Sequence, residues 1–117
     1  MNETITIQEA IHEYLIAIQE QNKSEKFTNT ARRSLKRVEA FFGPDFLVKN
    51  LNPSNIQDFY YSSEFIKLPT GKQRRKRTLF AFSRAIVQFR RWMTEMNYFS
   101  ADQAPEMLFF PRLKGEY

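Results

Sequence analysis

Apolar residues recur along most of the chain at the three- and four-residue spacing of an amphipathic α-helix. Four stretches carry this pattern: residues 7–18, 25–42 and 53–60, and a long stretch from about residue 72 or 73 to about 97. No stretch alternates apolar and polar residues as a half-buried strand does. The pattern therefore predicts an all-α protein in which four amphipathic helices bury their apolar faces together in a compact bundle.

The ends of these stretches carry the signals that start and stop helices. Thr6-Ile7-Gln8-Glu9 is a capping box, Ser24 is a cap for the second helix, and Asn52-Pro53 opens the third. Gly43-Pro44 ends the second helix, because Gly tolerates the left-handed C-terminal conformation and Pro cannot continue the hydrogen-bond ladder. Pro69-Thr70-Gly71 indicates the loop before the last helix.

A chain of 117 residues fits one domain with one hydrophobic core. We expect residues 1–104 to form the helical domain and residues 105–117 to form an irregular tail, because periodicity is weak there. No apolar run approaches the roughly 20 residues of a membrane span, and the N-terminus lacks the pattern of a secretory signal. The chain contains no Cys and therefore no disulfide. We expect a cytoplasmic protein without a membrane partner.

Candidate catalytic residues are scarce. His12 is the only histidine, and without cysteine the chain has no zinc signature and no thiol nucleophile. Because His12 lies off the apolar stripe, it is most simply an exposed helical residue. Three glycines, Gly43, Gly71 and Gly115, are too far apart for a phosphate-binding loop. We expect no enzymatic activity in this chain, no metal and no cofactor.

Positive charge is concentrated in two parts of the chain. The formal net charge of +5 favours a polyanionic partner. Residues 65–94 contain nine Lys or Arg residues and no Asp or Glu, and the outward face of the second helix is also basic. The candidate DNA-binding residues are Lys26, Arg32, Arg33 and Lys36 on the second helix, and Lys72, Gln73, Arg74, Arg75, Lys76, Arg77 and Arg84 in or before the fourth.

Cations at the start of a helix oppose its dipole, at about 0.3–1 kcal/mol each, so we interpret these charges as serving a partner. Lys and Arg neutralise DNA phosphates and release counterions, and residues such as Gln73 and Arg74 can reach base edges in the major groove. A basic run by itself is also typical of a solvated helix start, a targeting signal or a non-specific tether. Basic faces on two separate helices favour DNA.

Other functions are open at this point. Phe80 and Trp92 lie off the central apolar stripe, so with the tail they can form the docking surface of a helical protein–protein adaptor. Aromatic residues near arginines also stack on unpaired bases, although burial is the simpler explanation. A helix-turn-helix regulator needs a short turn between two perpendicular helices, and the order of elements does not obviously supply one.

Taken in order, the elements resemble the N-terminal SAM-like, core-binding domain of phage-type tyrosine recombinases, or integrases. The resemblance covers nearly the whole chain and rests on Thr6-Ile7 and Tyr14-Leu15, Leu35-Lys36-Arg37-Val38-Glu39-Ala40-Phe41-Phe42-Gly43, Leu51-Asn52-Pro53-Ser54-Asn55-Ile56, Ala85-Ile86, Phe89-Arg90-Arg91-Trp92, Asn97-Tyr98-Phe99, Ala104-Pro105 and Pro111-Arg112-Leu113-Lys114. The chain departs from the family at Ala31, where an aromatic residue is common, and the Leu-Ser-Ala-Leu-Arg character of the fourth helix is only partly kept.

The resemblance implies a SAM-like four-helix bundle that forms one half of a C-shaped clamp on double-stranded DNA, with the second and fourth helices facing the groove. It implies that the catalytic Arg, His and Tyr lie in a separate C-terminal domain of the same parent chain, so Tyr117 is not the nucleophile. The expected partners are double-stranded DNA, that catalytic domain and other recombinase protomers on the DNA. The parent would be encoded by a bacterium, a phage or another mobile element.

Overall fold

The computed structural model describes residues 4–98, in which five α-helices and one short 3-10 helix follow one another. The helices are α1 (Ile7–Glu20), α2 (Glu25–Phe42), η1 (Val48–Asn50), α3 (Pro53–Tyr60), α4 (Ser63–Ile66) and α5 (Lys76–Glu95). Within this range the extended pairing consists of two isolated bridges, Thr6 with Leu47 and Lys67 with Gln73. The predicted all-α fold is confirmed.

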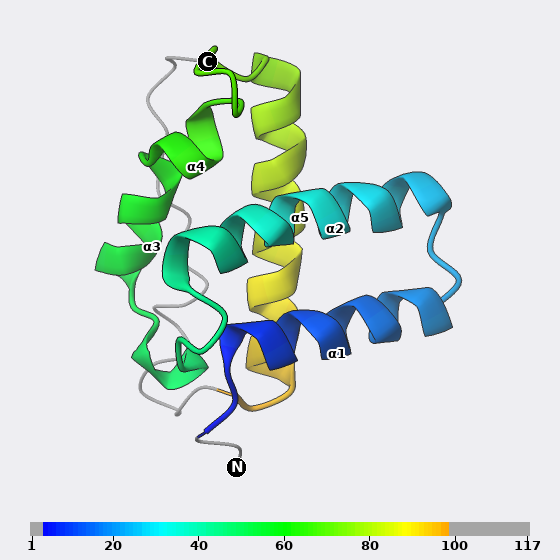
Figure 1. Cartoon of the computed structure of the whole chain (residues 1–117). Helices are drawn as coiled ribbons and strands as arrows, with labels where there is room; N and C mark the ends of the chain where they lie inside the picture. Colours follow the sequence, from blue (N-terminus) through cyan, green and yellow to red (C-terminus); the bar gives the residue numbers. More distant parts are fainter. Residues whose placement is uncertain (1–3, 99–117) are drawn as a thin grey trace.

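The helices α1 and α2 form an antiparallel hairpin, and α5 runs across both of them (Figure 1). In the same view α3 and α4 lie at the opposite side from the hairpin tip, which projects beyond α5. The helix α2 contacts α1, α4 and α5, and α5 also contacts α1. The helix α2 therefore lies at the centre of the fold, in contact with α1, α4 and α5.

The core lies where the hairpin crosses α5, and it is built from the stripes that the sequence predicts. All five predicted positions of α5 are buried: Leu79, Phe82, Ile86, Phe89 and Met93. The stripe of α1 is buried except for partly buried Leu15, and Ala31, Leu35 and Val38 of α2 are buried while Phe27 and Phe42 are partly so. The 3.6-residue period therefore identified the inward faces correctly.

The predicted helix caps are also present. The Thr6 hydroxyl accepts from the Glu9 N–H at 3.2 Å, and the Glu9 carboxylate accepts from the Thr6 N–H at 3.0 Å. The Ser24 hydroxyl accepts from the Phe27 N–H at 3.0 Å. Asn52 and Asn55 form a second reciprocal box. These side chains satisfy N–H groups that a helix leaves unpaired at its start.

The long helix begins later than the sequence predicts. We expected it to start at Lys72 or Gln73, whereas α5 starts at Lys76 and ends at Glu95. Residues 66–74 form a tight hairpin instead: the Leu68 N–H donates to the Lys72 carbonyl and the Arg74 N–H to the Ile66 carbonyl, both at 2.7 Å. Gly71 adopts a φ of +90° in its turn, which an L side chain rarely adopts. The short helix α4 was not predicted either.

Two further expectations concern the domain and the membrane. The proposed boundary between residues 1–104 and 105–117 lies outside the described residues. Among the helices from residue 4 to 98, none combines the length and the apolar character that crossing a bilayer requires.

The chain leaving α5 is fastened to α1. The Tyr98 hydroxyl donates to a Glu13 carboxylate oxygen at 2.6 Å, across 85 residues of sequence. The Tyr98 ring packs edge-on against Trp92, with 5.6 Å between centroids, and Trp92 packs on Tyr14 at 5.3 Å. This aromatic cluster holds the end of α5 against the hairpin.

The cluster predicts a loss of stability at alkaline pH. Burial first, then the hydrogen bond and the charge of Glu13, raise the pKa of Tyr98 to about 12, and burial raises that of Tyr14 to about 12 as well. Tyrosines of the unfolded chain ionise near pH 10, so from pH 10 to 12 the unfolded state binds fewer protons than the folded state. The free energy of unfolding should therefore be steady below pH 9 and fall between pH 10 and 12.

Urea denaturation across this range measures the slope. Tyr98→Phe should make the decline shallower, because only Tyr14 of the pair then remains. A Tyr98→Phe protein with the same slope as the wild type would contradict the assignment.

Candidate nucleic-acid interface

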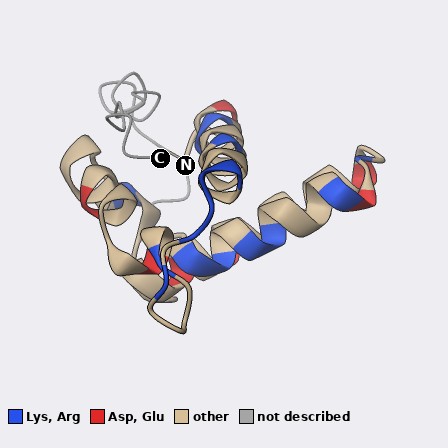
Figure 2. Cartoon of the chain, turned by 90° about the horizontal axis from the view of Figure 1, so that it is seen from above, with Lys and Arg blue, Asp and Glu red and all other residues tan. Residues whose placement is uncertain are grey.

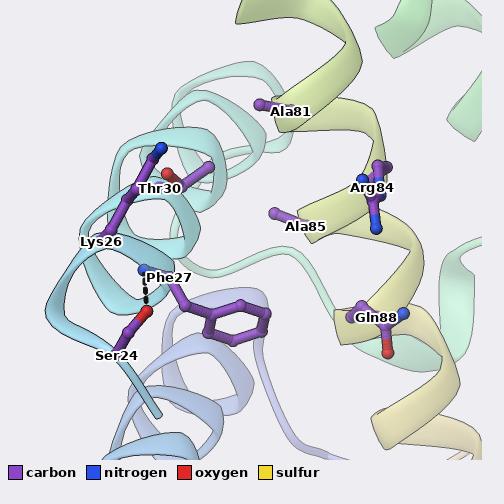
Figure 3. A pocket seen from close by; sticks show the side chains of 8 residues that line it. All are labelled: Ser24, Lys26, Phe27, Thr30, Ala81, Arg84, Ala85 and Gln88. Atoms are coloured by element: carbon purple, nitrogen blue, oxygen red, sulfur yellow. Dashed lines mark hydrogen bonds between the residues drawn. The ribbon is translucent and has the colours of Figure 1, made fainter.

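Basic side chains of α2 and α5 line the same cleft, which has a volume of about 310 Å³. Lys26 and Thr30 stand on the α2 side, and Arg84 and Gln88 stand on the α5 side (Figure 3). The ring of Phe27 points from α2 toward α5 and forms part of the apolar floor together with Ala81 and Ala85 of α5. Two helices far apart in sequence thus present cations to one concavity.

The cleft continues along α5 toward the end of that helix. An adjoining hollow of about 290 Å³ shares Phe27 and Gln88 with it and adds Lys23 and Arg91. Arg77, Ala81, Arg84, Gln88 and Arg91 follow one another at four- and three-residue intervals, so they lie on one face of α5. We call the two joined hollows the α2–α5 groove. Their lining includes Lys23, Lys26, Thr30, Arg84, Gln88 and Arg91, together with the acidic Glu95 near the end of α5.

A third hollow, of about 210 Å³, lies further along α2. Its lining residues are Arg33, Lys36 and Arg37 of α2, Pro69 and Arg74 of the 66–74 hairpin, and Phe82 of α5. We call it the arginine cleft. Figure 2 shows Lys and Arg along α2, along α5 and in the segment that leads into α5. Many of the basic residues between positions 4 and 98 therefore lie on α2, on α5 or in the segment between α4 and α5.

The predicted site residues divide into three groups. Lys26 and Arg84 line the α2–α5 groove, and Arg33, Lys36 and Arg74 line the arginine cleft. Arg32 is exposed but lines none of these hollows, and its guanidinium donates to the Asn29 side chain at 3.0 Å. The remaining candidates are exposed and lie in the 66–74 hairpin or at the start of α5: Lys72, Gln73, Arg75, Lys76 and Arg77.

Sequence reasoning missed four residues of these hollows. Lys23, Gln88 and Arg91 were not among the candidates, nor was Arg37 of the arginine cleft. Gln88 and Arg91 had a usable signal, because they continue the spacing of Arg84 along one helix face. Lys23 lies in the loop before α2, where helical periodicity gives no signal.

Arg74 differs most from its prediction. Its side chain is 7% exposed, its Nε donates to the Phe65 carbonyl at 3.1 Å, and its guanidinium carbon lies 5.4 Å from the centroid of the Phe82 ring. Burial first, then the nearby charges of Arg37 and Arg33, lower the pKa of Arg74. We expected Arg74 to reach base edges from an exposed helix. It is instead built into the wall of the fold.

Arg90 is a second buried cation in residues 65–94, the segment that contains no Asp or Glu. Arg90 of α5 is 3% exposed and lies beside the buried Tyr60. Burial lowers its pKa, and the Tyr60 hydroxyl opposes that shift. Arg90 therefore adds to the charge of the sequence without adding to the basic surface.

The start of α5 keeps its unfavourable electrostatics. Arg75 occupies the N-cap without a side-chain hydrogen bond to the helix, and Lys76 follows in a first turn that holds no acidic residue. Cations here oppose the helix dipole. Among the described residues no three His, Cys, Asp or Glu side chains gather as a metal site would require. A negatively charged group near this end of α5 would offset the repulsion.

The two aromatic residues predicted to form a docking surface, Phe80 and Trp92, differ in their exposure to solvent. Phe80 is 60% exposed on α5. Trp92 is half-buried against Tyr14, Phe89 and Tyr98. The tail, which was the third part of that proposal, lies outside the described residues. Phe80 is therefore the exposed aromatic residue on which an adaptor surface would depend.

The burial of Arg74 predicts unequal effects of two adjacent substitutions. Arg74→Ala should lower the free energy of unfolding by about 1–3 kcal/mol, because the Phe65 carbonyl loses its donor and Phe82 loses its covering group. Arg75→Ala removes the same charge from an exposed position and should change stability by no more than about 0.5 kcal/mol. Urea denaturation of both variants measures the difference. Equal stabilities would show that Arg74 does not support the fold.

Comparison with known proteins gives no match to a family model, to a curated protein or to a solved structure. The placement of charged side chains around α2 and α5 is therefore the basis for inferring a function.

Proposed function

We propose that this chain binds double-stranded DNA through the α2–α5 groove, as the non-catalytic, core-site clamping domain of a site-specific tyrosine recombinase. The observation that carries the proposal is that Lys26 of α2 and Arg84 of α5 line one cleft. The exposed lysines and arginines around it are flexible cations of the kind that neutralise phosphates and release counterions.

The dimensions of α5 support a duplex as the ligand. Its 20 residues correspond to a length of about 30 Å. The face from Arg77 to Arg91 spans about 21 Å of that length at 1.5 Å per residue. A major groove about 12 Å wide admits one α-helix. Along this face Gln88 supplies an amide between two arginines, so α5 offers both phosphate contacts and a group that reads base edges.

The recombinase part of the proposal rests on the family resemblance. Core-binding domains of that family turn their second and fourth helices toward DNA. Since α4 is a single short turn here, α5 takes the place of the fourth helix and α2 that of the second. The remaining partners are then a catalytic domain in the same parent chain and further protomers on the DNA. Such a module, encoded by a bacterium, phage or mobile element, acts in the cytoplasm.

A titration of the ¹⁵N-labelled chain with a short duplex at two salt concentrations tests DNA binding directly. We expect backbone amides of α2 and α5 to shift, with a Kd on the order of 10⁻⁴–10⁻⁶ M for non-specific DNA near physiological salt. Affinity should fall steeply as salt rises, with a slope of about −0.9 per phosphate contacted. A spectrum that stays unchanged by duplex in dilute buffer would refute the proposal.

Charge reversal tests the groove itself. Arg84→Glu should weaken duplex binding by about tenfold or more, since it replaces an attraction with a repulsion inside the groove. Lys49→Glu makes the same change in charge on η1, at an exposed position outside the groove, and should have a much smaller effect. Fluorescence anisotropy with a labelled duplex measures both, and circular dichroism checks that both variants are folded. A larger loss for Lys49→Glu would place the interface elsewhere.

A protein–protein adaptor is the second candidate, and the exposure of Phe80 favours it. The same titration separates the two functions, because an adaptor surface has no reason to respond to duplex. Phe80→Ser would abolish partner binding in an adaptor and leave the salt dependence of DNA binding unchanged.

A further inference from the structure

Four cations from two parts of the chain converge in the arginine cleft. Arg33, Lys36 and Arg37 project from α2, and Arg74 comes from the 66–74 hairpin. One acidic side chain is paired with this group: Glu64 of α4 accepts from the Arg37 Nη1 at 3.1 Å. Within residues 4–98, Glu64 is the carboxylate paired with this group, and the four cations then leave an excess of three positive charges around a hollow of about 210 Å³.

Two of these guanidinium groups share one aromatic ring. The guanidinium carbons of Arg33 and Arg74 lie 5.5 Å and 5.4 Å from the centroid of Phe82, which is itself buried. Arg74 is also fixed through its Nε to the Phe65 carbonyl and through its backbone N–H to the Ile66 carbonyl. A guanidinium fixed in this way loses less freedom on binding a ligand than a solvated side chain does.

Like charges at this spacing oppose the fold. Arg33 and Arg37 both disfavour the charged form of Arg74, and Glu64 offsets only part of that effect. A surface that needed positive charge merely for solubility would spread these groups apart. An anion in the hollow would relieve the repulsion between them.

We propose that the arginine cleft is a binding site for one phosphate group. Phosphate suits it because guanidinium donors match the oxygens of a tetrahedral oxyanion and because its negative charge, one on a phosphodiester and up to two on inorganic phosphate, offsets part of the local excess. The inference deepens the proposed function and rests on it for the source of the ligand: in the DNA complex the group is a backbone phosphodiester, and without DNA it is inorganic phosphate. Bound there, it joins the 66–74 hairpin to α2.

The first arm of the test uses inorganic phosphate against sodium chloride of equal ionic strength, with the melting temperature (Tm) of the full chain as the readout. At ten times its Kd, phosphate should raise the Tm of the wild type by about 5–10 °C more than chloride does. Arg33→Gln should lose this increment. Arg32→Gln is the matched control, because it removes the same charge from the preceding residue, which lies outside the cleft, and it should keep the increment.

The second arm follows the Arg74 side-chain Nε–H signal and the backbone amides of residues 66–74 by NMR. Phosphate should shift these signals in the wild type, and the duplex should shift the same ones. Lys36→Gln provides a second cleft variant and should weaken both effects. Folding of each variant is checked by circular dichroism.

The outcomes separate the two proposals. A phosphate response that Arg33→Gln removes, together with a duplex that shifts nothing, would refute DNA binding and support the cleft as a site for free phosphate. Duplex shifts on α5 together with a phosphate effect no larger than that of chloride would overturn the cleft and leave DNA binding standing. An equal phosphate effect in the wild type, Arg33→Gln and Arg32→Gln would also overturn it.

Discussion

The packing of α2 against α5 is the contact on which the rest of this structure depends. The helix α2 is also the partner of α1 and α4, so one helix joins the hairpin, the short helices and the long helix. Apolar residues such as Leu35 and Phe82 make this crossing favourable by leaving water. Cations flank the buried stripes on both helices, so the same packing that forms the core brings positive charges together. Fold and basic surface are consequences of one crossing.

Much of this arrangement was readable from the sequence because it is encoded locally. The apolar period fixed the inward faces of α1, α2 and α5, and side chains such as Thr6 and Asn52 marked helix starts that the structure shares. The exposed candidates on α2 and α5 follow from the same periodicity, since a residue opposite an apolar stripe faces solvent. Local patterns therefore predicted which residues are available to a partner, but not which hollows they line.

What the sequence did not reveal depends on contacts between distant segments. The basic run 72–77 resembles a helix start, yet the hydrogen bond from the Arg74 N–H to Ile66 and the turn at Gly71 hold its first part in a hairpin. Arg74 is buried because Phe65 and Phe82 lie beside it, and neither neighbour is apparent from its own segment. Arg90 is likewise interior because α3 brings Tyr60 against α5. Charge counted along a chain overstates the charge on its surface wherever tertiary contacts enclose an arginine.

Phe82 belongs both to the hydrophobic core and to the lining of the arginine cleft. One side of its environment is the apolar core, and the other is a hollow lined by Arg33 and Arg74. An anion bound in that hollow would act on groups that also pack on the core, so its binding would be thermodynamically coupled to folding. The α2–α5 groove differs, because its cations Lys23, Lys26, Arg84 and Arg91 are exposed. A polyanion that occupies both would gain its salt-dependent affinity mainly in the groove and its fixed position mainly in the cleft, since only the cleft presents a guanidinium that the fold already holds in place.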